Sequence, residues 1–204
     1  MTERLTIASL PMNKYIAWHK RVLFVVCCVP LAYLIYKALI GGLGVNPIEA
    51  TTRFLADWGL RFLLITLALT PLRLISGFAY LTRFRRMLGL FAFFYVFLHM
   101  MSYAGLDQFF YWPEIWRDII KRKYITFGFI AFVMLSFLAV TSTDAMVRRI
   151  GGHRWQRLHS LVYPAGIAAV VHFFYMTKAD YTQPVLYAAF LAIILGYRLF
   201  RRYT

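Results

Sequence analysis

The 204-residue chain is both strongly apolar and strongly basic: 61% of its residues are hydrophobic, 19% are aromatic, and its formal net charge is +15. Together with a mean hydropathy of +0.63, this composition excludes an ordinary soluble domain and indicates a multi-pass membrane protein. The basic residues gather at the ends of apolar segments rather than in one tail. This distribution argues against nucleic acid as a partner. It indicates contact with membrane lipid instead.

Six apolar stretches are long enough to cross a bilayer, since a crossing helix needs about 20 residues. They lie at approximately residues 22–40, 58–75, 87–106, 124–142, 155–176 and 184–202. We therefore predict an all-α membrane protein, a bundle of six transmembrane helices that forms one domain over residues 1–204. These stretches leave no room for a soluble catalytic domain, so any catalytic partner is expected to be a separate protein.

Turn-forming residues separate these stretches. The Gly- and Pro-containing segment 41–47 is expected to end the first helix. Its glycines resemble a nucleotide-binding loop only superficially, because they follow a membrane helix rather than a strand. Residues 141–144 are expected to end the fourth span and cap a short segment at 145–150. Pro164 predicts a kink within the fifth span.

The distribution of Lys and Arg predicts the orientation of the chain. Most of the basic residues fall on the side that also holds the N-terminus, including those at positions 83, 85, 86, 148, 149, 154, 157, 198, 201 and 202. The positive-inside rule then places both termini in the cytoplasm. The run Lys121-Arg122-Lys123 is the main counter-signal, because this orientation places it outside.

Three histidines lie within otherwise apolar stretches: His99 in the third, and His159 and His172 in the fifth. An ionisable side chain inside a membrane span usually faces the bundle interior and pairs with another group there. A haem iron held between helices is the simplest partner that two imidazoles can share. The alternative for each histidine taken singly is a hydrogen bond to a neighbouring carbonyl group.

The expected depth of each histidine in the bilayer divides the three into an outer pair and one inner residue. At ~1.5 Å per residue, His99 and His172 both fall in the outer half, ~7 Å apart in height. His159 lies near the inner face. We therefore predict His99 and His172 as the axial pair of one haem. Since His159 is ~20 Å along the helix from His172, it would belong to a second, inner site for another haem, a flavin or a quinone.

Other polar residues near the outer histidines have two interpretations each. Ser102, Tyr103 and Tyr175 could donate or accept hydrogen bonds around the haem, or could serve only in packing and interfacial anchoring. Arg61 could pair with a haem propionate, or its side chain could extend to the lipid headgroups.

The chain also resembles the MsrQ family of membrane haem proteins over most of its length. The shared motifs, in chain order, are Gly42-Leu43-Gly44 with Asn46-Pro47, Leu60-Arg61-Phe62-Leu63-Leu64, Thr70-Pro71-Leu72, Arg86-Met87-Leu88-Gly89-Leu90, Leu98-His99 with Ser102-Tyr103, Thr141-Ser142-Thr143 with Ala145-Met146, Trp155-Gln156-Arg157-Leu158-His159, Val162-Tyr163, His172, and Gln183-Pro184 with Leu186-Tyr187. Each motif is weak alone, but their order and spacing together are specific.

This resemblance implies a ferric-reductase-like bundle in the bacterial inner membrane that binds b-type haem and is itself a non-catalytic electron-transfer subunit. The family passes electrons from the quinone pool to MsrP, a periplasmic molybdopterin enzyme that reduces methionine sulfoxide in oxidised proteins, and members are reported to bind FMN. His99, His159 and His172 match the three histidines associated with haem in this family.

Two other classes of function share some of these features. A transmembrane ferric reductase or oxidase component would use the same haem bundle with another electron acceptor. A small transporter would need charged groups and broken helices around a site at the membrane midplane. The near absence of acidic residues within the spans argues against a transporter.

Overall fold

Residues 10–203 of the computed structural model are described here, and they contain helices and connecting turns but no strand. The chain divides into two compact units, residues 1–42 and residues 43–204. In the first unit the described residues form one long helix, α1 (Leu10–Leu39), with Pro30 inside it. The next residues turn through glycines with left-handed backbone, Gly41 at φ +67° and Gly44 at φ +83°, so the predicted helix end is confirmed.

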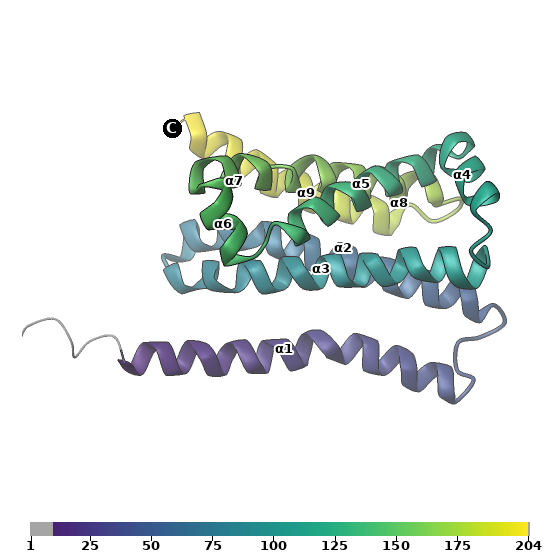
Figure 1. The fold of residues 1–204 in the computed structure, drawn as a ribbon, viewed down its shortest axis with the longest axis horizontal. Coiled ribbons are helices and arrows are strands. Elements are labelled where there is room, and N and C mark those ends of the chain that lie inside the picture. The colour runs from purple at the N-terminus through teal and green to yellow at the C-terminus, as the bar shows by residue number, and fades with distance from the viewer. Residues whose placement is uncertain (1–9, 204) are drawn as a thin grey trace, which may run out of the picture. The chain divides into compact units, whose positions relative to one another are not determined.

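The second unit is a bundle of helices that run side by side (Figure 1). In chain order it contains α2 (Pro47–Ser76), the 3-10 helix η1 (Ala79–Phe84), α3 (Arg85–Met101), the π-helix η2 (Ser102–Asp107), α4 (Trp112–Lys121), α5 (Lys123–Val140), α6 (Asp144–Ile150), α7 (Gly152–His159), α8 (Val162–Met176) and α9 (Thr182–Tyr203). The most extensive packing joins α2 to α3 and α5 to α8. The short helix α4 lies at one end of the unit and α6 and α7 lie at the other, and we name these the α4 end and the α6 end.

Six helical segments among the described residues are long and apolar enough to cross a membrane, which confirms the predicted number of spans. They are Tyr15–Leu39, Pro47–Ser76, Ala79–Asp107, Lys123–Val140, Gly152–Met176 and Thr182–Arg201. The second span begins earlier than its predicted start at residue 58. Its first turns are polar, and Asn46 caps them by accepting a hydrogen bond from the Glu49 N–H at 3.2 Å.

The fifth span differs from a single kinked helix. It breaks after His159, where α7 ends, and resumes at Val162, where α8 begins. Pro164 lies in the first turn of α8, where a missing N–H costs no helical hydrogen bond. The short segment after the fourth span is the helix α6, and its predicted cap is confirmed: Thr143 accepts a hydrogen bond from the Met146 N–H at 3.2 Å.

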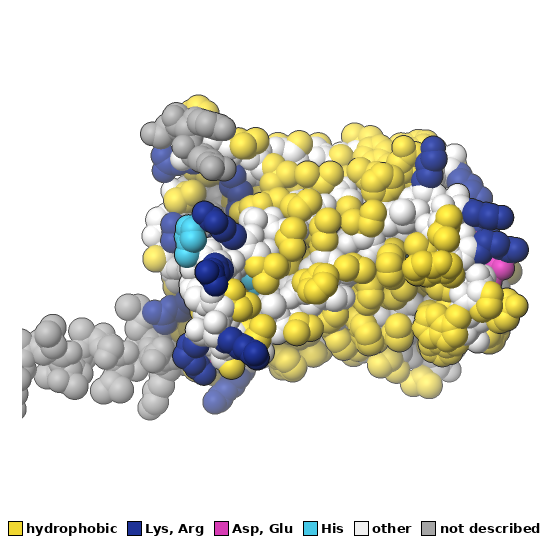
Figure 2. Space-filling view, turned by 45° about the horizontal axis from the view of Figure 1, so that its top comes forward, with side chains coloured by type: hydrophobic (Ala, Val, Ile, Leu, Met, Phe, Trp, Pro, Cys, Tyr) yellow, Lys and Arg dark blue, Asp and Glu magenta, His cyan; other side chains and the backbone are white. Residues whose placement is uncertain are grey.

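The surface of the second unit has the character expected in lipid. Hydrophobic side chains cover the face shown in Figure 2, whereas Lys and Arg gather toward its ends. Large apolar residues are widely exposed, for example Ile193 at 69% and Phe137 at 59%. An apolar surface of this extent is unusual on a soluble monomer and typical of a bundle surrounded by hydrocarbon.

Candidate functional site

His99 and His172 come together between α3 and α8, toward the α4 end of the bundle. Their ring centroids are 6.2 Å apart, and the ring planes are inclined by 66°. Both residues are half-buried. The two rings therefore lie next to each other, although they come from helices far apart in sequence.

Each of these two rings is anchored to a backbone carbonyl group. The Nδ1 atom of His99 lies 2.9 Å from the carbonyl oxygen of Thr52 in α2. The Nδ1 atom of His172 lies 2.6 Å from the carbonyl oxygen of Tyr124 in α5. Because a carbonyl oxygen only accepts hydrogen bonds, Nδ1 must carry the proton in both rings. The Nε2 atoms then keep their lone pairs, which is the state that a metal ligand requires.

The separation of the rings suits two ligands on opposite sides of one metal ion. A transition metal binds imidazole nitrogen at about 2 Å, and each nitrogen is about 1.1 Å from its ring centroid, so the centroids should be about 6 Å apart. The observed 6.2 Å agrees with this spacing. Within residues 10–203 no group of three or more His, Cys, Asp or Glu side chains could hold a metal ion. The pair therefore fits the axial positions of a haem iron better than an ordinary metal site.

Gly128 in α5 makes room for the His172 ring. A Cβ atom at this position would lie 2.8 Å from His172 Nδ1 and 3.0 Å from its Cε1 atom, closer than such atoms normally approach. The imidazole thus packs directly on the α5 backbone. Only a glycine inside an apolar, helix-forming stretch marks this residue in the sequence, and no role was predicted for it.

Ser102, Tyr103 and Tyr175 contact groups other than the two imidazoles. The Ser102 hydroxyl lies 2.6 Å from the hydroxyl of Thr52, whose carbonyl holds His99. Tyr103 donates to Asp118, and the ring of Tyr175 stacks on Phe127 at 5.9 Å. Ser102 thus acts on its histidine only through Thr52.

A buried carboxylate connects the two sides of the histidine pair. Asp118 in α4 is only 3% exposed. It accepts a hydrogen bond from the Tyr103 hydroxyl at 2.9 Å and pairs with Arg122 Nε at 2.9 Å. Arg122 also donates to the Tyr124 hydroxyl, and this hydrogen bond raises the pKa of the guanidinium. The network therefore runs from the segment that follows His99 to the residue whose carbonyl holds His172.

His159 lies apart from this pair, at the C-terminal end of α7. Its ring stacks on Trp155 with centroids 3.8 Å apart and planes inclined by 25°. Its Nε2 atom lies 3.2 Å from the Thr141 hydroxyl oxygen. The same Trp155 donates through its indole N–H to the Thr141 carbonyl at 2.8 Å, so His159 is held at the junction of α5 and α7.

His159 also lines a cavity of about 440 Å³ at the α6 end. Three arginines from two helices, Arg85, Arg86 and Arg198, line the same cavity. The remaining wall is largely apolar or aromatic and includes Leu63, Leu67, Leu90, Leu135, Leu138, Trp155 and Tyr163. The cavity thus combines hydrophobic surface, one imidazole and three arginines. Neither His99 nor His172 lines it.

Arg61 makes contacts that neither of its two interpretations predicts. Its Nε–H donates to the Tyr187 hydroxyl of α9 at 3.0 Å. Its guanidinium carbon lies 5.0 Å from the centroid of the Trp58 ring. Arg61 therefore ties α2 to α9.

Comparison with known proteins gives a consistent pattern. Residues 55–170 match the family model for the ferric reductase like transmembrane component. A "Protein-methionine-sulfoxide reductase heme-binding subunit MsrQ" from Rhodospirillum rubrum is 55% identical over 176 residues, which cover 86% of this chain and 85% of that protein. Proteins with the same name from Polaromonas naphthalenivorans and Caulobacter vibrioides are 47% and 48% identical. They cover 91% and 83% of this chain, and 85% and 81% of their own lengths.

Proposed function

Because the chain belongs to the MsrQ family of ferric-reductase-like, multi-pass bacterial membrane proteins, we propose that it is the haem-binding electron-transfer subunit of a protein-methionine-sulfoxide reductase. The observation that carries this proposal is the geometry of His99 and His172. Their centroid separation of 6.2 Å and the two carbonyl-bound Nδ1 atoms support axial ligation of one iron through both Nε2 atoms.

A b-type haem bound between these two residues would supply one-electron transfer. His99 and His172 would both hold the iron, and two imidazole ligands would favour electron transfer over binding of oxygen or a substrate. The helices around the pair are apolar, so within a bilayer they would keep water away from the site. Thr52 and Tyr124 hold the rings through their carbonyl groups and make the ligating nitrogens more basic. The protein's part is thus to position and insulate the electron carrier.

We propose that both termini are cytoplasmic, which directs the α4 end to the periplasm. The support is the concentration of arginines at the α6 end, including Arg85, Arg86 and Arg149. A reporter enzyme that is active only in the periplasm should be inactive when fused after Thr204 and active when inserted at Ala179. The reverse pattern in whole cells would overturn this orientation.

In this orientation electrons travel outward. We propose the membrane quinone pool as the donor and MsrP, a periplasmic molybdopterin reductase, as the acceptor. His159 and its cavity at the α6 end are the proposed inner site, with a second haem or FMN as the candidate occupant. The His99–His172 site lies toward the α4 end, where a soluble reductase could collect electrons.

The test is spectroscopic. The purified protein should show a sharp Soret band and, after reduction by dithionite, the split α/β bands of low-spin haem. Adding MsrP and methionine sulfoxide should reoxidise the haem under anaerobic conditions. A folded but colourless preparation would contradict the haem proposal. Reoxidation by a ferric chelate but not by MsrP would instead favour a transmembrane ferric reductase component.

A further inference from the structure

The cavity at the α6 end contains two guanidinium groups that no carboxylate balances. Arg86 is paired with Asp144, with 2.5 Å between Nη1 and Oδ1. Arg85 donates instead to the Thr70 hydroxyl. Among the described residues no carboxylate lies within ion-pair distance of Arg85 or Arg198. Arg198 is half-buried, whereas Arg85 is exposed. A cation in a half-buried, apolar setting such as that of Arg198 is costly unless an anion joins it.

Arg198 is held in a fixed position inside this cavity. From α9 it donates to the Tyr163 hydroxyl of α8 and to the Leu67 carbonyl of α2, the latter at 2.8 Å. Its Nε atom is buried and has no hydrogen-bond partner in the described part of the chain. The guanidinium of Arg198 is thus fixed between three helices, and its charge has no carboxylate partner among the described residues, which suits it to bind an anion.

The rest of the cavity fits the body of a flat, apolar group. Its volume of about 440 Å³ falls in the ordinary range of ligand pockets, roughly 300–1,000 Å³. Leucines from α2 and α5, such as Leu63 and Leu135, form part of its wall. The stacked rings of Trp155 and His159 also line it. Apolar surface on one part of the wall and unbalanced cations on another suit an aromatic molecule with an acidic group.

We propose that Arg198 and Arg85 form an anion-binding clamp in the α6-end cavity, which recognises the phosphate or carboxylate group of a planar aromatic cofactor. A flavin phosphate and a haem propionate are the two sources of this chemistry. The clamp rests on the proposed function in one respect, because its ligand would be the inner redox group of the same electron path.

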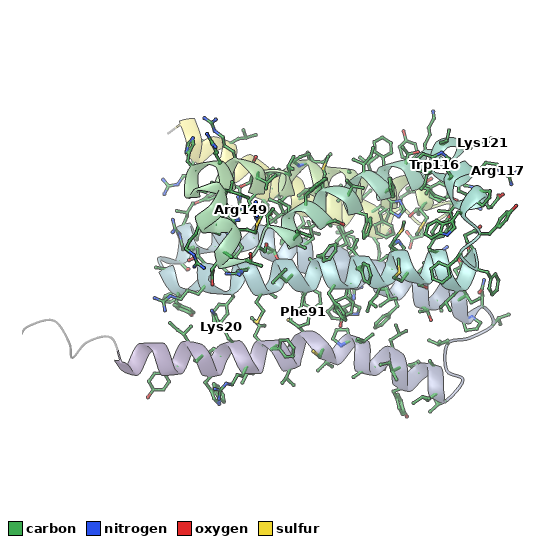
Figure 3. The ribbon with its side chains drawn as sticks, viewed as in Figure 1. Lys20, Phe91, Trp116, Arg117, Lys121 and Arg149 are labelled. Carbon is green, nitrogen blue, oxygen red and sulfur yellow. The ribbon has the colours of Figure 1, made fainter. Side chains whose placement is uncertain are left out.

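A topological role alone does not explain these two arginines. The positive-inside rule requires cations at the α6 end but not inside a cavity. Arg149 in α6 is exposed at the same end and does not line the cavity (Figure 3). Arg149→Gln is therefore the matched control, since it removes the same charge from the same end.

Flavin binding tests the clamp directly. The full-length protein is titrated with FMN and with riboflavin, which lacks the phosphate, and quenching of flavin fluorescence is measured. We expect FMN to bind more tightly than riboflavin. Arg198→Gln should weaken FMN binding roughly 10- to 100-fold, the usual effect of losing a charged hydrogen bond, and leave riboflavin binding unchanged. Arg149→Gln should change neither affinity, and Arg198→Lys should recover part of the preference.

The second arm of the experiment identifies a propionate. If the anion is a haem propionate, Arg198→Gln should lower the haem content per chain while Arg149→Gln does not, and FMN should show no preference over riboflavin. Equal behaviour of Arg198→Gln and Arg149→Gln in both arms would overturn the clamp. The low-spin spectrum expected from the His99–His172 site is recorded in every sample. If the unaltered protein does not show this spectrum, that result counts against the proposed function and not against the clamp.

Discussion

Replacing either His99 or His172 with Ala is expected to abolish the low-spin haem spectrum. Both residues hold their rings at the common site, and neither can substitute for the other because each is anchored to a different helix. With one imidazole removed, the other could not hold the iron alone in its low-spin form, and the result would be a high-spin centre or a haem that is lost during purification. Absorption spectra of the oxidised and reduced variants measure the effect.

Two other histidines provide controls for this prediction. His153→Ala removes an exposed imidazole at the α6 end and should leave the spectrum unchanged. His159→Ala should retain the low-spin signal of the outer site, because its ring belongs to the separate cavity. A His99→Ala protein with an unaltered low-spin spectrum would remove this residue from the axial pair.

Gly128→Ala is expected to impair haem binding nearly as much as loss of a histidine. The new methyl group would lie 2.8 Å from His172 Nδ1, so the ring must move away from α5 and from the Tyr124 carbonyl. Ala normally stabilises a helix relative to Gly by roughly 0.5–1 kcal/mol, so a loss must arise from the contact with the ring. We expect at least a tenfold fall in the low-spin fraction, measured by absorption and by electron paramagnetic resonance.

Gly196→Ala in α9 is the matched control, because a Cβ atom there would meet nothing within 4 Å. It should keep the full haem spectrum and a thermal midpoint at or above that of the unaltered protein. If Gly128→Ala behaves in the same way as Gly196→Ala, the His172 ring does not depend on close packing against α5.

Hydropathy alone predicts the six spans because crossing a bilayer requires length and apolar composition. It does not predict α4, a ten-residue helix that buries Ile115 on one face and exposes Trp116 and Arg117 on the other. Hydropathy also fails to predict the first turns of α2, because these turns are polar. Capping by Asn46, with Pro47 at the first helical position, was the available signal for that start.

The site could be predicted only in part. Counting residues from the charged span ends places His99 and His172 at similar heights, and the structure brings their rings together; their axial role and that of His159 stay predictions. The anchors could not be predicted, because Thr52 and Tyr124 act through carbonyl groups that every residue has. Arg198 belongs to a basic helix end that topology already explains, so nothing in the sequence marks it as a cavity residue.

The carbonyl anchors of His99 and His172 bear on the speed of electron transfer. Each imidazole is fastened through Nδ1 to the main chain of a helix packed in the bundle. A tethered ring would resist rotating or withdrawing if the charge on a bound iron changed, so gain or loss of an electron would entail little movement of His99 and His172. Such a preorganised setting keeps the energy of rearrangement small. The main chain of α2 and α5 would thereby favour rapid exchange in both directions.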